Sequence, residues 1–508
     1  MRIPYLSLTA LVVLQVQGAE LLVNTTSGPM QGFYNTSSQI VRAFLGIPYA
    51  ESPVGARRFA LPVAKSRAKK PFVADVLPPI CPGVYSPSNE SIISVLPYLQ
   101  GSPGGTSEDC LRLNVWAPAA AHPGRKGKAA VMVFIHGGMF YQGSPSSPFM
   151  DGTYIVRDNE EVIVVSIQYR LTIFGYPGAP NIPLVEQNVG LQDQRMAIEW
   201  VHQNIAQFGG DPDRILLFGQ SAGAVSTDMS LYAHRDSPLV HAAILQSGVA
   251  GMWNHDAPTA QANWTEVSTA LGCRSGHGTL KCMREQPIDQ IIDAVRAAGN
   301  TFYPVQDNIT VFPDYSALSR QGKIAPVPTL IGIVDRELAI LYNLSSKTIN
   351  ETAMYVRSQT EFNCPTHETV HLRLQNNIPT YRYVYHGNYT NISPVPWLGA
   401  YHGSDLPAVF GSYNMSGTGI PSTPREIADN RYIQDAWVSF AKDPHNGLAR
   451  LGWPKYDPAQ NTLVDLATGS AQVATFSSSD KWDGSCNGSH FISSVRPTSG
   501  RVRVRQSL

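Results

Sequence analysis

The feature that most constrains this chain is the pentapeptide Gly219-Gln220-Ser221-Ala222-Gly223, which directly follows the apolar run at residues 215–218. An apolar strand that ends in G-x-S-x-G and turns at once into a helix holds the serine in strained backbone geometry, with its hydroxyl above the sheet. Glycines flank the serine because side chains there would collide with the neighbouring strand and helix. The pattern also arises by chance in a long chain, so its context decides how it is interpreted.

Strand-like and helical segments alternate around this turn. Residues 131–135 and 162–167 are short, continuous apolar runs, as in strands that are buried on both faces. Apolar side chains recur at helical spacing over residues 190–208, and Gly209-Gly210 ends that pattern. Asp211-Pro212-Asp213 predicts a turn into the strand before Ser221. Further strands are expected at residues 242–245, 329–334 and 381–385.

This alternation predicts an α/β fold with a large, mostly parallel central sheet that helices cover on both faces. Residues 260–330 and 340–400 are expected to be insertions over the end of the sheet that carries Ser221. Neither an internal repeat nor a low-complexity segment interrupts the pattern.

The first residues predict a secretory signal peptide over residues 1–18. Met1-Arg2 precedes an apolar stretch at residues 3–16, which is too short to span a bilayer comfortably, and Gly18-Ala19 follows it. A membrane anchor is the alternative interpretation. No later segment of the sequence is long and apolar enough to span, so we expect a secreted protein without stable membrane insertion, whose residues 19–508 form one large domain.

Charge and cysteine content narrow the class of protein further. Lys plus Arg and Asp plus Glu both total 38, so the zero net charge gives no electrostatic footprint for nucleic acid. The six cysteines include no C-x-x-C pair, which favours disulfides over a metal site. Many N-x-S/T sequons favour a glycosylated surface: Asn24, Asn35, Asn89, Asn263, Asn308, Asn343, Asn350, Asn388, Asn391, Asn414 and Asn487.

Acyl transfer at a serine needs a base, an acid that orients the base, and donors for the oxyanion. The loop His136-Gly137-Gly138-Met139-Phe140 follows an apolar strand and exposes backbone N–H groups that suit the oxyanion. His402 is the candidate base because it lies in a loop late in the chain. The acid is expected between Ser221 and His402 at the end of a strand, where the spacing leaves both Asp335 and Glu337 open.

With these motifs in place, the chain closely resembles the type-B carboxylesterase/lipase family, which includes cholinesterases and secreted fungal lipases. The resemblance runs almost from end to end. It is carried by motifs in the family's order: Phe44–Ala50, Pro53–Gly55, Arg58-Phe59, Ser107–Leu111, Leu113–Val115, Asn188–Leu191, Asp193–Arg195, Phe218–Gly223, Ala243–Gly248 and His402–Leu406. It implies an α/β-hydrolase fold and a serine carboxylic ester hydrolase that acts on a small-molecule ester without a cofactor or metal.

Matched residue by residue, the resemblance assigns the parts of the reaction. It makes Ser221 the nucleophile, Glu337 the acid and His402 the base. The N–H groups of Gly138, Met139 and Ala222 become the oxyanion donors. The family's pairings also imply three disulfides and two structural ion pairs: Cys81–Cys110, Cys273–Cys282, Cys364–Cys486, Arg58–Glu108 and Arg170–Asp193.

Four departures from the family pattern bear on specificity. Met139 stands where a small residue is usual, so its side chain is expected to crowd the substrate pocket. Gln220 replaces the glutamate of cholinesterases, and residues 96–106 lack their cation-binding tryptophan, so choline-ester specificity is not supported. Leu338 follows the acid where the family has glycine.

Other parts of the pocket stay open. The loop between Cys81 and Cys110 is either a lid, a gorge wall or a glycosylated surface loop. Phe302 and Phe312 are candidate substrate-binding residues, and a place in the core is the alternative for either. Two further functions are weighed against hydrolysis. One is an acyltransferase or lactonising enzyme with the same triad, and the other is a recognition module without catalysis. The sequence leaves the oligomeric state open.

Overall fold

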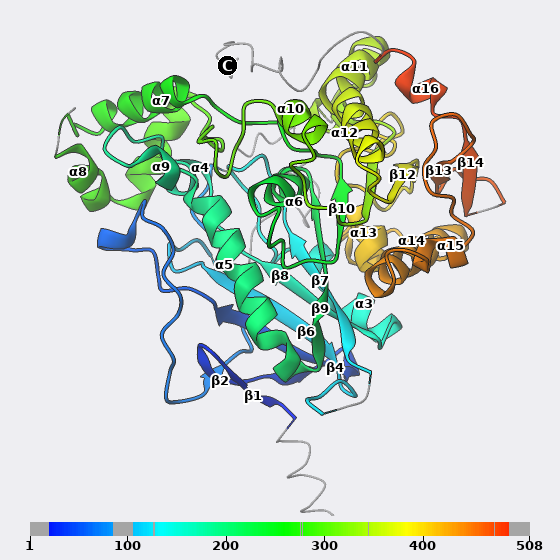
Figure 1. Ribbon diagram of the computed structural model, residues 1–508, viewed down its shortest axis with the longest axis horizontal. Coiled ribbons are helices and arrows are strands. Elements are labelled where there is room, and N and C mark those ends of the chain that lie inside the picture. Colours follow the sequence, from blue (N-terminus) through cyan, green and yellow to red (C-terminus); the bar gives the residue numbers. More distant parts are fainter. Residues whose placement is uncertain are drawn as a thin grey trace, which may run out of the picture.

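The computed structural model describes residues 20–84, 105–124, 127–274, 276, 278–343, 345–471 and 473–486. Over these residues the chain forms one large mixed sheet with helices on both faces (Figure 1). The sheet order is β14-β13-β12-β11-β10-β9-β7-β8-β6-β4-β3, and β1, β2 and β5 form a small separate sheet. From β8 across to β13 the neighbouring strands are parallel, and the outer pairs are antiparallel.

The strands have these bounds: β1 Leu22–Thr25, β2 Gly28–Gln31, β3 Phe33–Asn35, β4 Ser38–Pro48, β5 Phe72–Val73, β6 Arg112–Pro118, β7 Ala129–Ile135, β8 Val162–Ile167, β9 Gly210–Gln220, β10 Ala242–Gln246, β11 Thr329–Val334, β12 Thr380–Tyr385, β13 Leu463–Leu466 and β14 Ala474–Ser477. The α-helices are α3 Thr153–Asp158, α4 Thr172–Gly175, α5 Val189–Asn204, α6 Ala222–Ala233, α7 Ala257–Ala270, α8 Thr279–Glu285, α9 Ile288–Ala298, α10 Tyr315–Arg320, α11 Glu351–Ser358, α12 Cys364–Gln375, α13 Leu406–Phe410, α14 Pro424–Lys442, α15 Gly447–Arg450 and α16 Asp480–Asp483.

The central strands are buried on both faces, which explains their continuous apolar sequence. In β7, Val131 and Val133 belong to the core under α5 and α6, whereas Met132 and Phe134 belong to a second core under α3, α13 and α14. Figure 1 shows these two helix groups on opposite sides of the sheet. The predicted α/β-hydrolase architecture is therefore confirmed.

Most of the predicted elements form close to their expected bounds, and the structure corrects two of them. Asp211-Pro212-Asp213 does not precede the strand but lies inside β9, where it bulges between the paired residues Gly210 and Ile215. The stretch 340–400 is not all insertion, because it contains the sheet strand β12. The segment 260–330 carries α7 to α10 between β10 and β11, as an insertion would.

Covalent and ionic cross-links agree with the resemblance. The disulfides Cys81–Cys110, Cys273–Cys282 and Cys364–Cys486 are all present. The ion pairs Arg58–Glu108 and Arg170–Asp193 are also present, with N···O distances of 2.6 and 2.7 Å. Because all four charged side chains are largely buried, each pair keeps two distant segments in fixed contact.

One sequon is incompatible with a glycan in the folded chain. Asn391 is 1% exposed, and its amide nitrogen donates to Glu426 Oε1 at 2.8 Å. By contrast, several sequon asparagines are exposed: Asn24, Asn308, Asn343, Asn350, Asn388 and Asn414. A glycosylated surface is therefore compatible with the fold at these positions but not at Asn391.

Two predictions fall outside the described residues. The signal peptide at residues 1–18 is one, and most of the loop between Cys81 and Cys110 is the other, since its residues 85–104 are not described. Among the helices that the structure does describe, none has the length and apolarity needed to cross a membrane.

Candidate active site

Ser221 lies at a sharp turn between β9 and α6. Its backbone has φ 58° and ψ −126°, a conformation that L-residues rarely adopt. The turn is possible because Gly219 and Gly223 lack side chains. A Cβ on Gly219 would lie 2.3 Å from the Gly223 carbonyl carbon, and one on Gly223 would lie 2.0 Å from the Ile135 carbonyl oxygen. The geometry is that of a nucleophile elbow.

His402 and Glu337 meet between two loops that leave the same end of the sheet. The Arg336 N–H donates to the Ala400 carbonyl at 2.9 Å, which joins the loop after β11 to the loop before α13. His402 Nδ1 then lies 2.5 Å from Glu337 Oε2. Glu337 is 1% exposed, and its Oε1 accepts from the Val334 N–H at 3.0 Å, so the carboxylate is held from both sides.

The structure brings Glu337, not Asp335, to His402. The Asp335 carboxylate instead lies 3.2 Å from Nδ1 of His386, whose Nε2 lies 2.9 Å from Asp465. Burial opposes a charge on His386, but hydrogen bonds with the two carboxylates outweigh it and raise the pKa of His386 to about 9. This second histidine belongs to a structural cluster.

The Nε2 atom of His402 contacts the residue before Ser221. It lies 3.1 Å from Nε2 of Gln220, and no hydrogen bond joins Ser221 to His402 among the described residues. Because Nδ1 faces a carboxylate, Nδ1 carries the proton and Nε2 is the acceptor of the Gln220 amide. The elbow and the His402–Glu337 pair are thus adjacent, with Gln220 between them.

The loop after β7 offers backbone donors beside the elbow. Gly138 has φ 109°, and a Cβ on it would lie 2.1 Å from the Gln142 carbonyl oxygen, so this position requires glycine. Met139 also has a positive φ of 52°. Within the described residues, the N–H groups of Gly138, Met139 and Ala222 donate to no protein acceptor. Gly137 packs against this elbow, since its Cβ would lie 2.9 Å from that of Ser221.

His136 stabilises the loop and does not titrate near neutral pH. Burial lowers the pKa of its imidazole to about 4. The ring stacks on Tyr169 with centroids 4.5 Å apart, and the Tyr169 hydroxyl donates to the His136 carbonyl at 2.9 Å. The neutral, fully buried ring therefore fixes the start of the loop.

Phe362 is a neighbour of the site that the sequence did not reveal. Its ring lies against His402, with centroids 4.9 Å apart, and against Trp253, with centroids 5.8 Å apart. It belongs to a π-helical turn, Gln359–Asn363, and such turns occur often at functional sites. No motif surrounds Phe362, and the only sequence signal near it is Cys364.

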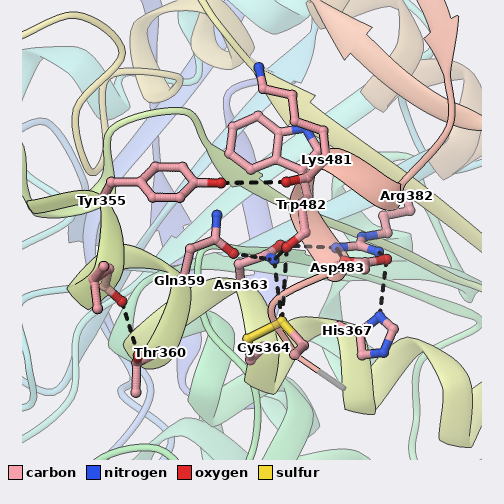
Figure 2. The surroundings of a disulfide bond; sticks show 12 residues. Tyr355, Gln359, Thr360, Asn363, Cys364, His367, Arg382, Lys481, Trp482 and Asp483 are labelled. Atoms are coloured by element: carbon pink, nitrogen blue, oxygen red, sulfur yellow. Dashed lines mark hydrogen bonds and ion pairs between the residues drawn. A yellow bond between two sulfur atoms is a disulfide. The ribbon is translucent and has the colours of Figure 1, made fainter. Parts of the chain in front are cut away.

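A covalent clamp holds that turn in place (Figure 2). The Cys364–Cys486 disulfide follows the turn, and the Asn363 amide donates to the Trp482 carbonyl at 2.5 Å. The neighbouring Asp483 pairs with Arg382 at 2.5 Å. The end of the described chain is thereby tied to the wall of the site.

A buried carboxylate lies behind the His402–Glu337 pair. Asp405 Oδ2 accepts from Gln246 Nε2 at 2.7 Å and from the Tyr383 hydroxyl at 3.4 Å. Burial raises the pKa of Asp405 to about 6, and the charge of Glu337 adds to the increase. The sequence motif around His402 contains Asp405, but nothing in it indicates this buried position.

The remaining predicted pocket residues differ in exposure. Met139 is partly buried, and its sulfur lies 3.6 Å from the Tyr141 hydroxyl. Phe302 is 1% exposed and belongs to the large core, and Phe312 packs edge-on against Tyr315 at 5.9 Å. A role for Phe302 in substrate binding stays a prediction. Among the described residues, no group of three or more His, Cys, Asp or Glu side chains is placed to hold a metal ion.

Comparisons with known proteins agree on one family. The family model described as Carboxylesterase family matches residues 19–355 and 342–483. Chlorogenic acid esterase of Aspergillus niger is 36% identical over 476 residues, which cover 89% of this chain and 91% of the relative. Secreted lipase 5 of Gibberella zeae is 34% identical over 504 residues, with 90% and 92% covered. Acetylcholinesterase of Bungarus fasciatus is 29% identical, with 91% and 85% covered.

Proposed function

The chain belongs to the carboxylesterase family and is a carboxylic ester hydrolase with the α/β-hydrolase fold, and we propose that Ser221, His402 and Glu337 are its catalytic triad. The observation that carries this proposal is the 2.5 Å contact between His402 Nδ1 and Glu337, beside a serine on a strained elbow. Because the contact fixes the proton on Nδ1, Nε2 has a lone pair with which to accept the serine proton.

The reaction proceeds in two steps. Ser221 Oγ attacks the ester carbonyl carbon while His402 Nε2 takes its proton, and Glu337 stabilises the resulting imidazolium. His402 then gives the proton to the departing alkoxide, which leaves an acyl-enzyme. In the second step His402 accepts a proton from water, whose oxygen attacks the acyl carbon. His402 then returns this proton to Ser221 Oγ as the acyl bond breaks, which releases the acid and restores the free enzyme.

The oxyanion of each tetrahedral intermediate is bound by the N–H groups of Gly138, Met139 and Ala222. Their lack of acceptors within the described residues supports this role, because unpaired, preorganised donors stabilise developing charge without rearrangement. Loss of one such donor typically slows the reaction by about 100- to 1000-fold. No cofactor or metal takes part in these steps.

We also infer that the protein is secreted as a single domain. The apolar N-terminal segment supports removal of residues 1–18, and the name of the secreted fungal relative and the three disulfides favour an oxidising compartment. Residues 19–508 would then form the mature chain.

We propose that the substrate is a small-molecule ester, and that the part of it that lies beside Ser221 is of modest size. The partly buried Met139 supports a restricted pocket. The names of the two fungal relatives make chlorogenic acid and lipid esters the first candidates. Choline esters are not among the candidates. Cholinesterases have a glutamate directly before the serine, whereas this chain has the neutral Gln220, so a substrate cation would find no carboxylate at that position.

The test is hydrolysis of chlorogenic acid and of p-nitrophenyl esters of increasing acyl length by the wild type and Ser221→Ala. We expect turnover by the wild type and a loss of about 10³-fold or more in the variant. A folded wild type that cleaves none of these esters would favour a recognition module. Ester products that form when an alcohol is added, in place of free acid, would instead favour an acyltransferase.

A further inference from the structure

Gln220 and Ser221 compete for a single acceptor. In the neutral imidazole of His402, Nδ1–H donates to Glu337, so Nε2 has one lone pair in the ring plane. That lone pair faces the side-chain amide of Gln220 at 3.1 Å. A hydroxyl proton on Ser221 cannot use the same lone pair at full strength while the amide holds it.

The position of the Gln220 side chain is confined by its neighbours. Gln220 is 5% exposed, and it lies between the loop that carries the backbone donors and the loop that carries His402. A Cβ on Gly137 would lie 2.8 Å from Gln220 Oε1, and a Cβ on Gly403 would lie 3.6 Å from Gln220 Nε2. The absence of a side chain at Gly137 therefore leaves space that this amide fills, whereas a Cβ on Gly403 would only be in ordinary van der Waals contact with it.

A glutamine can make this contact with a neutral imidazole, whereas an ionised glutamate has no proton to donate. A glutamate at position 220 would accept from Nε2–H and so favour the protonated ring, whereas the glutamine donates and favours the neutral ring. The charged groups that face His402 are Glu337 and Asp405. Gln220 adds no third carboxylate beside the ring.

We propose that Gln220 is a positioning residue that occupies His402 Nε2 in the free enzyme and keeps the ring neutral until substrate binding displaces the amide. Ser221 then donates its proton to the vacated lone pair. The inference rests on the proposed triad. It predicts that the free enzyme reacts slowly with small serine reagents and stays active to lower pH than an enzyme with a glutamate at this position.

Three variants test the inference. Gln220→Met keeps the length of the side chain but cannot donate, Gln220→Glu reverses the hydrogen bond, and Gln203→Glu is a matched charge control at an exposed position of α5. The rate of Ser221 labelling by a fluorophosphonate is measured for each, together with kcat/KM for p-nitrophenyl acetate from pH 5 to 9. Thermal unfolding checks that each variant is folded.

Gln220→Met is expected to be labelled about two- to tenfold faster than the wild type, the worth of one hydrogen bond. Gln220→Glu is expected to move the acidic limb of kcat/KM to higher pH by about one to three units, and Gln203→Glu to leave it unchanged. If both Gln220 variants keep the acidic limb of the wild-type kcat/KM profile and are labelled no faster than the wild type, the inference about Gln220 is wrong. The proposed triad would not be affected by that result. A wild type that cleaves no ester and resists the reagent would overturn the proposed triad as well.

Discussion

At the scale of single residues, Met139 combines a backbone role with a side-chain role. Its φ of 52° lies in the left-handed region, which glycine adopts without strain. A methionine at position 139 therefore has a conformational cost that a glycine would not have. Its sulfur contacts the Tyr141 hydroxyl and its side chain is partly buried, which supports a role for it in the proposed pocket.

Met139→Gly is expected to widen the range of esters without loss of the backbone donor. The ratio of kcat/KM for a bulky ester to that for p-nitrophenyl acetate should rise by about tenfold or more, since removal of the side chain relieves a steric clash worth over about 1.4 kcal/mol. The measurement is steady-state kinetics on the two esters. An unchanged ratio would remove Met139 from the pocket.

Glu337→Gln tests the orientation of the base. An amide presents either its oxygen or its N–H to Nδ1, and the second choice reverses the tautomer of His402. We expect kcat to fall by about 10³- to 10⁴-fold with KM little changed. Asp335→Asn is the matched control, because Asp335 contacts His386 and should leave kcat within about threefold.

The sequence could predict the elbow, because the steric demand on its glycines is local. It could not separate Asp335 from Glu337 by spacing, since both follow the same strand and the difference depends on a 3-10 turn that begins at Glu337. Phe362 was missed for a similar reason. Its contact with His402 joins segments that carry no common motif.

At the scale of elements, the π-helical turn Gln359–Asn363 connects the C-terminal clamp to the site. The disulfide Cys364–Cys486 closes a separation of 122 residues, whereas Cys273–Cys282 closes only 9. On the chain-entropy model the longer loop contributes about 5 kcal/mol and the shorter about 3 kcal/mol. The longer disulfide also ends next to the turn that carries Phe362.

We therefore expect the double variant Cys364→Ser/Cys486→Ser to lose more stability than Cys273→Ser/Cys282→Ser, by about 2 kcal/mol in denaturant unfolding. It should also lower kcat, because Phe362 contacts His402, whereas the control pair should not. Equal kcat in the two double variants would show that the clamp does not position the ring.

The turn predicted at Asp211-Pro212-Asp213 lies within strand β9 instead of before it. Asp-Pro-Asp is a strong local turn signal, and the chain does bend there, but the residues on either side both pair with β7. The turn chemistry thus makes a bulge within one strand. Local propensity identifies the bend, but only the partner strand decides whether the strand continues through it.

At the scale of the whole molecule, the alternation of apolar strands and helices was enough to predict a doubly covered sheet. The order of the strands was not predictable, because it depends on which continuous apolar runs pair, and these runs are nearly equivalent in composition. The antiparallel strands β3, β4 and β6 at one edge carry no catalytic residue and no turn signal that the sequence analysis used.

An ion-pair cluster around His386, at the carboxyl ends of two strands, makes the free energy of unfolding depend on pH. His386 bridges Asp335 after β11 and Asp465 in β13, and its pKa is raised from 6.5 to about 9. The raised pKa in the folded state stabilises the protein fully below pH 6.5, and this contribution is lost as the pH rises through 9. The contribution is of the order of 3 kcal/mol.

The unfolding free energy of the wild type should therefore fall between pH 7 and 10 more steeply than that of His386→Gln, which lacks the titrating group. Denaturant unfolding at several pH values gives the comparison. Parallel curves for the two proteins would mean that the bridge between β11 and β13 does not hold a charged imidazolium.

The proposed reaction depends on the activation of Ser221 by His402 and Glu337. The most direct measurement is mass spectrometric mapping of the site labelled by a fluorophosphonate in wild type and in folded His402→Gln. We expect one adduct, on Ser221, in the wild type and labelling slowed by about 10³-fold or more in the variant. An adduct on another residue, or equal labelling of both proteins, would contradict the proposed activation.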